Sequence, residues 1–180
     1  MTNSRSPFVL RPSSFVVLVI GIDPGTATTG YGLVREHESD STLECVAYGV
    51  VTTPPNQPLP NRLQTIHREL KDIITLHRPD SGAVEKLFFQ KNVSTAMAVG
   101  QGRGVAMLAL ADCGLEVGEY TPREVKQAVA GYGSADKRQM QEMVRVLLNL
   151  DIIPKPDDAA DALAVAICHL YSMKMNALMR

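Results

Sequence analysis

The 180-residue chain has little of several features that would point to particular classes of protein. Its three cysteines, Cys45, Cys113 and Cys168, form no CxxC pair and have apolar neighbours. We therefore expect no disulfide framework and no zinc site, but buried thiols in a reducing cytoplasm. The formal net charge is −1, so the chain as a whole is not basic. A nucleic-acid partner would therefore have to bind a local positively charged surface. No stretch approaches the ~20 apolar residues of a membrane helix, so no membrane association is expected.

The N-terminal segment, residues 1–15, shows little periodicity, and we expect it to be a loose tail before one domain, residues 16–180. A chain of this length can bury a sizeable core without disulfides or metals. The apolar run after the tail is short and ends at Asp23 and Pro24 rather than at a small-residue cleavage site. A secretory signal is therefore not expected.

The most informative stretch is VVLVIGIDPG, residues 16–25. Its apolar, mostly β-branched residues predict a strand that is buried on both faces. Asp23 ends this strand, and Pro24 and Gly25 then turn the chain. A carboxylate in this place can face a cleft, but the same residues also suit an ordinary turn, and the stretch alone does not decide between them.

The remaining pattern predicts four more strands and five helices. The strands are expected at about 30–35, 43–52, 83–85 and 116–120, and the helices at about 61–77, 92–113, 122–129, 134–150 and 157–173. Thr121 is the expected N-cap of the third helix, with Pro122 in its first turn. Two hairpins would make the first three strands antiparallel. The order predicts an α/β fold, in which a mixed five-stranded sheet carries helices on both faces.

Further carboxylates lie at the ends of predicted elements. Glu85 ends the fourth strand, and Asp157, Asp158 and Asp161 begin the last helix. Asp157, as a helix cap, and to a lesser degree Asp158 are explained by the favourable interaction of a negative charge with the N-terminal end of the helix dipole. Asp161 is not, because it begins an apolar run, where a carboxylate needs a cation or a hydrogen-bond donor beside it. Asp158 and Asp161 are three residues apart and share a helix face, whereas Asp157 is expected to point elsewhere. Clustered carboxylates suit Mg²⁺ or Mn²⁺, and two such ions can hydrolyse a phosphodiester.

Several segments resemble the RuvC family of Holliday-junction resolvases, in order and with the family's spacing. They are GIDPGTATTGYG, VEKLFFQKN, GQGRGVAMLAL, REVKQAVAGYGSADKRQM and PDDAADALAVAICH, and the resemblance covers about residues 16–177. It implies an RNase H-like domain that forms a homodimer and cuts four-way DNA junctions symmetrically, in recombination and repair, with Mg²⁺ or Mn²⁺. It also implies the branch-migration proteins RuvA and RuvB as partners.

By this resemblance, one set of carboxylates is both catalytic and metal-binding. The set is Asp23, Glu85, Asp158 and Asp161. Family members can carry His at the position of Asp158, which makes this ligand the most substitutable. Phe88 corresponds to an aromatic residue that stacks on an unpaired base of the junction. Because adjacent residues of a strand point to opposite faces, we expect Phe88 outside and Phe89 inside.

Lys126 and Lys137 match family lysines near the catalytic cleft, and Arg123 and Arg138 are further candidates for DNA contact. The alternative for each is an ordinary solvated helix face. The helix at about 92–113 contains three glycines, which cost helix stability and need a reason. Close packing against the sheet is one reason, and packing across a dimer axis is another. His169 is expected to be a packed residue rather than part of the site.

Three other functions compete with a resolvase. The GIDPGT loop also resembles the phosphate loop of actin-like and sugar-kinase ATPases, but these need two lobes, which 180 residues cannot supply. The acidic residues equally fit another RNase H-like nuclease that acts on RNA or on other branched DNA. A protein that binds junctions without cutting them gains nothing from carboxylates that repel phosphate. We therefore expect a junction-resolving endonuclease.

Overall fold

The centre of the fold is a five-stranded sheet with the strand order β3-β2-β1-β4-β5. The computed structural model describes residues 17–37, 41–86 and 93–179. The strands are β1 (Val17–Asp23), β2 (Thr28–Glu36), β3 (Leu43–Thr52), β4 (Ser81–Glu85) and β5 (Val117–Tyr120). The first three strands pair antiparallel, whereas β4 runs parallel to both β1 and β5. The predicted mixed sheet is therefore confirmed.

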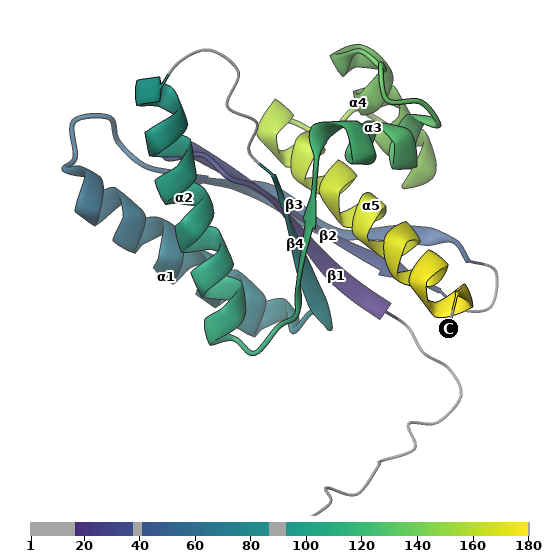
Figure 1. Cartoon of the computed structure of the whole chain (residues 1–180), viewed down its shortest axis with the longest axis horizontal. Helices are drawn as coiled ribbons and strands as arrows, with labels where there is room; N and C mark the ends of the chain where they lie inside the picture. The colour runs from purple at the N-terminus through teal and green to yellow at the C-terminus, as the bar shows by residue number, and fades with distance from the viewer. Residues whose placement is uncertain (1–16, 38–40, 87–92, 180) are drawn as a thin grey trace, which may run out of the picture.

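Helices cover both faces of the sheet, as the sequence predicts (Figure 1). The helices are α1 (Leu59–His77), α2 (Val93–Asp112), α3 (Pro122–Ala130), α4 (Lys137–Leu147) and α5 (Asp157–Leu178). α1 and α2 lie on one face, whereas α5 lies on the other with α3 and α4 packed against it. Within the described ranges, no helix is both long enough and apolar enough to span a membrane.

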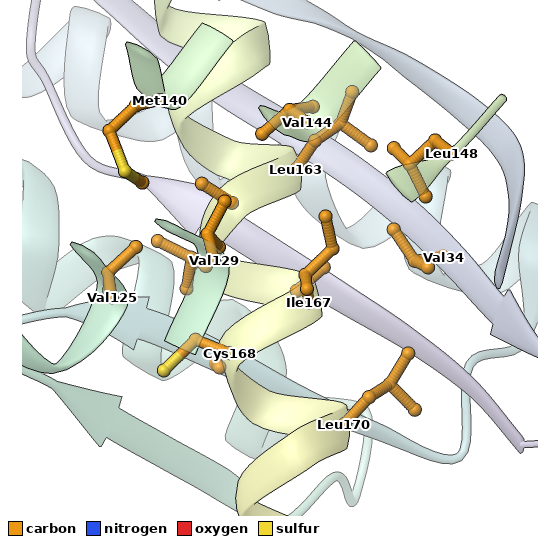
Figure 2. Close-up of a cluster of buried hydrophobic side chains, with 14 of the residues drawn as sticks. Val34, Val125, Val129, Met140, Val144, Leu148, Leu163, Ile167, Cys168 and Leu170 are labelled. Atoms are coloured by element: carbon orange, nitrogen blue, oxygen red, sulfur yellow. The ribbon is translucent and has the colours of Figure 1, made fainter. Parts of the chain in front are cut away.

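The central strand β1 separates two hydrophobic cores. Because side chains alternate along a strand, Ile20 faces the core beneath α1 and α2, whereas Val19 faces the core beneath α5. Figure 2 shows the second core, where Leu163 and Ile167 of α5 meet residues of α3 and α4 such as Val144. The expectation that β1 is buried on both faces is confirmed, since its residues from 18 to 22 are all buried.

Helix ends differ from the predictions where capping or continuity decides them. α3 begins as expected, with a capping box between Thr121 and Glu124. α4 begins at Lys137 rather than at 134, because the Asp136 side chain accepts a hydrogen bond of 2.9 Å from the backbone of Gln139 and thereby caps the helix. α5 continues to Leu178, five residues beyond the predicted end, since no glycine or proline interrupts it.

The prediction of buried thiols holds for Cys168, which is buried, whereas Cys45 and Cys113 are only partly buried. Two other predictions fall on residues outside the described ranges. These are the loose tail at 1–15 and the opposite orientations of Phe88 and Phe89.

Candidate active site

Helix α5 lies directly on β1 and β2 because glycines face it. A Cβ atom on Gly21 would lie 2.2 Å from the carbonyl oxygen of Ala162, and one on Gly30 would lie 2.0 Å from that of Asp158. Any side chain at these two positions would push the helix away. Gly30 is also the register partner of Asp23. The first turn of α5 is therefore held beside the end of β1.

Glu85 lies at the same end of the sheet as Asp23. β1 and β4 are adjacent and parallel, and Ile22 pairs with Val84 in their register. The next residues along the two strands, Asp23 and Glu85, therefore end side by side. The charges of Glu85, Asp158 and Asp161 all act on Asp23. The structure thus brings together the four carboxylates that the sequence predicts.

This environment disfavours ionised carboxylates. Burial raises the pKa of Asp23 to about 7, and repulsion by the neighbouring carboxylates adds to the rise, whereas Lys137 opposes it. Burial, with repulsion by Asp161, also raises the pKa of Glu85 to about 7, against the attraction of Lys126. The pKa of Asp161 is raised as well, chiefly by burial. A cation placed among these groups would offset the repulsion.

A cleft of ≈ 220 Å³ opens beside the carboxylates, between the end of β4 and helices α3, α4 and α5. Its lining consists of Glu85, Pro122, Val125, Lys126, Lys137, Met140, Asp161 and Ala164. Two carboxylates and two lysines therefore share one cavity. Both lysines that the sequence places near the cleft line it, whereas Arg123 and Arg138 are exposed and do not belong to its lining.

Lys137 forms ion pairs with α5. Its Nζ atom lies 3.1 Å from Oδ2 of Asp157 and 3.6 Å from Oδ2 of Asp161. These contacts, led by the hydrogen bond with Asp157, raise the pKa of Lys137. The Lys137 ammonium group therefore lies beside the carboxylates in the lining of the cleft.

Two expectations about Asp157 are wrong. The N-cap of α5 is Pro156, and no side chain caps the helix. The Asp157 carboxylate instead accepts a hydrogen bond of 2.9 Å from Lys155 as well as pairing with Lys137, and the two lysines lower its pKa to about 2. It does not point away from Asp161 either, because residues four apart lie on the same helix face.

The four carboxylates could supply the all-oxygen ligands that Mg²⁺ and Mn²⁺ prefer. The partial burial of Asp23, Glu85 and Asp161 and the repulsion among the carboxylates also fit a divalent cation. In the part of the chain that the structure describes, no three Asp, Glu, His or Cys side chains form a ready-made metal cage. Asp161 pairs with Lys137 in this structure, so a cation bound to Asp161 would compete with the lysine.

The structure adds hydrogen bonds that no sequence pattern indicated. The loop after Asp23 is held by the Thr29 hydroxyl, which donates to the Gly25 carbonyl at 2.6 Å, and by the Thr53 hydroxyl, which donates to the Thr26 carbonyl at 2.5 Å. At the end of β4, Nε of Arg103 donates to the Glu85 carbonyl at 3.1 Å. The segment GQGRG marks Arg103 only as part of the family resemblance, without a role.

His169 is packed, as the sequence predicts, and it also joins three elements. Its Nε2 lies 2.9 Å from the Ser81 hydroxyl of β4, and its Nδ1 lies 2.9 Å from the Tyr120 hydroxyl at the end of β5. Burial lowers the pKa of His169 to about 4, so the ring is neutral near pH 7. The residue ties α5 to the parallel half of the sheet.

Comparison with known proteins identifies the family of the chain. Residues 19–169 match the family described as "Crossover junction endodeoxyribonuclease RuvC". The protein of that name from Chloroflexus aurantiacus is 60% identical over 153 residues, which are 85% of this chain and 92% of the relative. The one from Rubrobacter xylanophilus is 54% identical over 160 residues, which are 89% of this chain and 88% of the relative.

Solved structures show the same similarity. The Thermus thermophilus RuvC structure has a TM-score of 0.82 and 36% identity, and the match covers 89% of this chain and 97% of that one. The complex of T. thermophilus RuvC with a Holliday junction substrate has a TM-score of 0.83 and 35% identity, over 89% and 96% of the two chains. The fold is thus that of RuvC, RNase H-like as expected, and the chain belongs to the RuvC family of crossover junction endodeoxyribonucleases.

Proposed function

We propose that this protein resolves four-way (Holliday) DNA junctions by paired, symmetric hydrolysis of phosphodiester bonds in recombination and repair. One observation carries the proposal: Asp23, Glu85, Asp158 and Asp161 gather at one edge of the sheet, beside a cleft that two lysines line. The relative from T. thermophilus, which shares this fold, has been solved with a Holliday junction substrate. The expected products carry 5′-phosphate and 3′-hydroxyl ends.

We propose that the four carboxylates hold two Mg²⁺ or Mn²⁺ ions in each active site. Bound ions of this kind activate a water molecule and stabilise the leaving oxygen. Asp23 and Glu85, at the ends of paired strands, supply ligands whose backbones are fixed. Asp158 and Asp161 supply ligands from the first turns of a helix that two glycines seat on the sheet.

Lys126 and Lys137 are proposed to contact the DNA backbone at the scissile phosphate, since both line the cleft with Glu85 and Asp161. Arg123 and Arg138 are exposed outside it, so we assign them at most contacts with the duplex arms. The proposal that Phe88 stacks on an unpaired junction base is supported only by the resemblance of its segment to the family.

A homodimer is proposed through α2, which is apolar on both sides. Residues Met97 and Leu108 are 65% and 53% exposed, and a Cβ atom on Gly104 would have no described atom within 4 Å. A helix that keeps apolar residues on its outer face suits a protein interface. A two-fold dimer would present two equivalent sites to a two-fold symmetric junction. RuvA and RuvB are proposed as further partners, and the cytoplasm as the location.

The test is cleavage of an end-labelled four-way junction, beside a linear duplex and an RNA–DNA hybrid, each with Mg²⁺, Mn²⁺ or a chelator. Paired symmetric nicks in the junction alone, abolished by the chelator, are the expected result. Cleavage of the hybrid instead would assign the carboxylates to another RNase H-like nuclease. Tight binding without cleavage under either metal would contradict the assignment as an enzyme.

A further inference from the structure

Two consecutive residues of α2 contact the ends of both strands that carry predicted metal ligands. Gly102 packs against the loop after β1: a Cβ atom there would lie 3.2 Å from the carbonyl group of Gly25 and 3.3 Å from Cγ2 of Thr26. Arg103 donates from Nε to the carbonyl oxygen of Glu85 at 3.1 Å. Consecutive residues of α2 therefore contact the loop after β1 and the end of β4.

Arg103 also reaches the neighbouring strand. Its terminal nitrogen pairs with the carboxylate of Glu119 in β5, and only 19% of the Arg103 side chain is exposed. The planar guanidinium group can donate to both acceptors at once in a fixed geometry, which a lysine cannot do. The side chain thus joins α2 to β4 and β5 at the same level of the sheet.

The hydrogen bond between Arg103 and Glu85 lies where the pairing of β4 with β5 ends. The backbone nitrogen of Lys86 donates to the Tyr120 carbonyl at 2.7 Å, and the carbonyl of Glu85 in the same peptide group accepts from Arg103. The peptide group after Glu85 is therefore fixed from both sides. These two bonds fix the backbone from which the Glu85 side chain extends to the cleft that it lines with Asp161.

We propose that Arg103 is a positioning residue of the active site. Together with the close approach of Gly102, it holds α2 against the ends of β1 and β4 and fixes Asp23 and Glu85 for a divalent cation. The inference rests on the proposed metal-dependent function. Residues that support metal ligands typically change metal affinity or activity about 10- to 100-fold when they are removed.

The experiment compares Arg103→Met and Arg103→Lys with the control Arg68→Met, whose wild-type side chain is 67% exposed on α1. Three quantities are measured on the full chain: Mn²⁺ binding by EPR titration, the Mg²⁺ concentration for half-maximal junction cutting, and junction binding in chelator. Arg103→Met should weaken Mn²⁺ binding and raise the Mg²⁺ requirement about tenfold, with junction binding unchanged. Arg103→Lys should fall between, and Arg68→Met should match the wild type.

The variant Glu119→Gln distinguishes a positioning role of Arg103 from a purely structural one. It removes the ion pair with Arg103 but leaves the hydrogen bond from Arg103 to the Glu85 carbonyl. This variant should keep the wild-type metal requirement, whatever its melting temperature. The inference is overturned if Arg103→Met keeps wild-type Mn²⁺ affinity, or if Glu119→Gln weakens it equally. If Arg103→Met does not fold, Arg103→Lys against Glu119→Gln decides in the same way. A wild-type protein that neither binds Mn²⁺ nor cuts junctions would contradict the proposed function instead.

Discussion

Lys137 and Asp161 form an ion pair of 3.6 Å at the mouth of the carboxylate cluster. The lysine begins α4 and the aspartate lies in the second turn of α5, so the pair joins two elements of the site. The same ammonium group is 3.1 Å from Asp157. On the proposed function, a divalent cation bound to Asp161 would compete with Lys137 for this carboxylate, and the pair with Asp157 would keep the lysine in the cleft.

This competition gives the first prediction. Lys137→Gln should slow junction cutting on the order of 100-fold, because a cation that faces the reacting phosphate is lost. Mn²⁺ affinity should stay the same or increase, because Asp161 no longer pairs with an ammonium group. Single-turnover cleavage and an EPR titration of Mn²⁺ measure the two effects. Equal losses of affinity and rate would show instead that Lys137 holds the ligands together.

His169 predicts a pH dependence of stability. Its pKa in the folded protein is about 4, below its ordinary value of 6.5. As the pH falls, His169 is therefore protonated in the unfolded chain before it is protonated in the folded protein. The stabilisation that neutral His169 provides is complete above pH 6.5 and is lost as the pH falls toward 4, by roughly 3 kcal/mol at most. Urea unfolding at pH 7 and pH 4.5 should show a larger loss for the wild type than for His169→Gln.

The wild type must be compared with His169→Gln because Asp23 and Glu85 change the stability with pH in the opposite direction. Asp23 and Glu85 have raised pKa values, so in chelator they favour the folded state more as the pH falls. The wild-type curve alone therefore mixes both signs. Equal pH dependence in the wild type and His169→Gln would show that the histidine does not contribute.

The proposed dimer predicts the effect of a charge on α2. Leu108→Glu should convert the dimer to a monomer and abolish paired nicks, because a carboxylate in an apolar interface loses its hydration. Light scattering after size-exclusion chromatography measures the mass. Leu76→Glu is the matched control, since Leu76 is 76% exposed near the C-terminal end of α1 rather than on α2, and it should remain dimeric. A dimer that survives Leu108→Glu would place the interface elsewhere.

Alanine variants can distinguish the expected roles of Phe88 and Phe89. Phe88→Ala should slow junction cutting with little change in melting temperature, since base stacking contributes roughly 1–3 kcal/mol to DNA contact. Phe89→Ala should mainly destabilise the fold, by about 3–5 kcal/mol if the ring is in the core. Thermal unfolding and cleavage are measured for both. A large loss of stability in Phe88→Ala would assign that ring to the core.

Much of the fold follows from local sequence patterns. The apolar run of β1 and the capping box at Thr121 depend on neighbours in the chain, and the structure has both where the sequence predicts them. The gathering of Asp23, Glu85, Asp158 and Asp161 was predicted because the family resemblance adds the long-range order that local patterns lack.

Other features depend on contacts that no local pattern contains. Asp157 looks like a helix cap from its position, but in the folded chain Lys137 of α4 pairs with it from 20 residues away. Arg103 meets the Glu85 carbonyl across 18 residues of sequence. Backbone acceptors of this kind leave no trace in residue type, so the structure was needed to find them.

The most direct test of the proposed active site is Asp23→Asn, assayed for junction binding in chelator and for cutting in Mg²⁺. The substitution keeps the size of the side chain and removes a charge from a crowded, partly buried cluster. We predict that cutting is abolished, that binding persists, and that the melting temperature in chelator at pH 8 does not fall. Cutting at the wild-type rate, or loss of binding and cutting together, would contradict the assignment of Asp23 as a metal ligand.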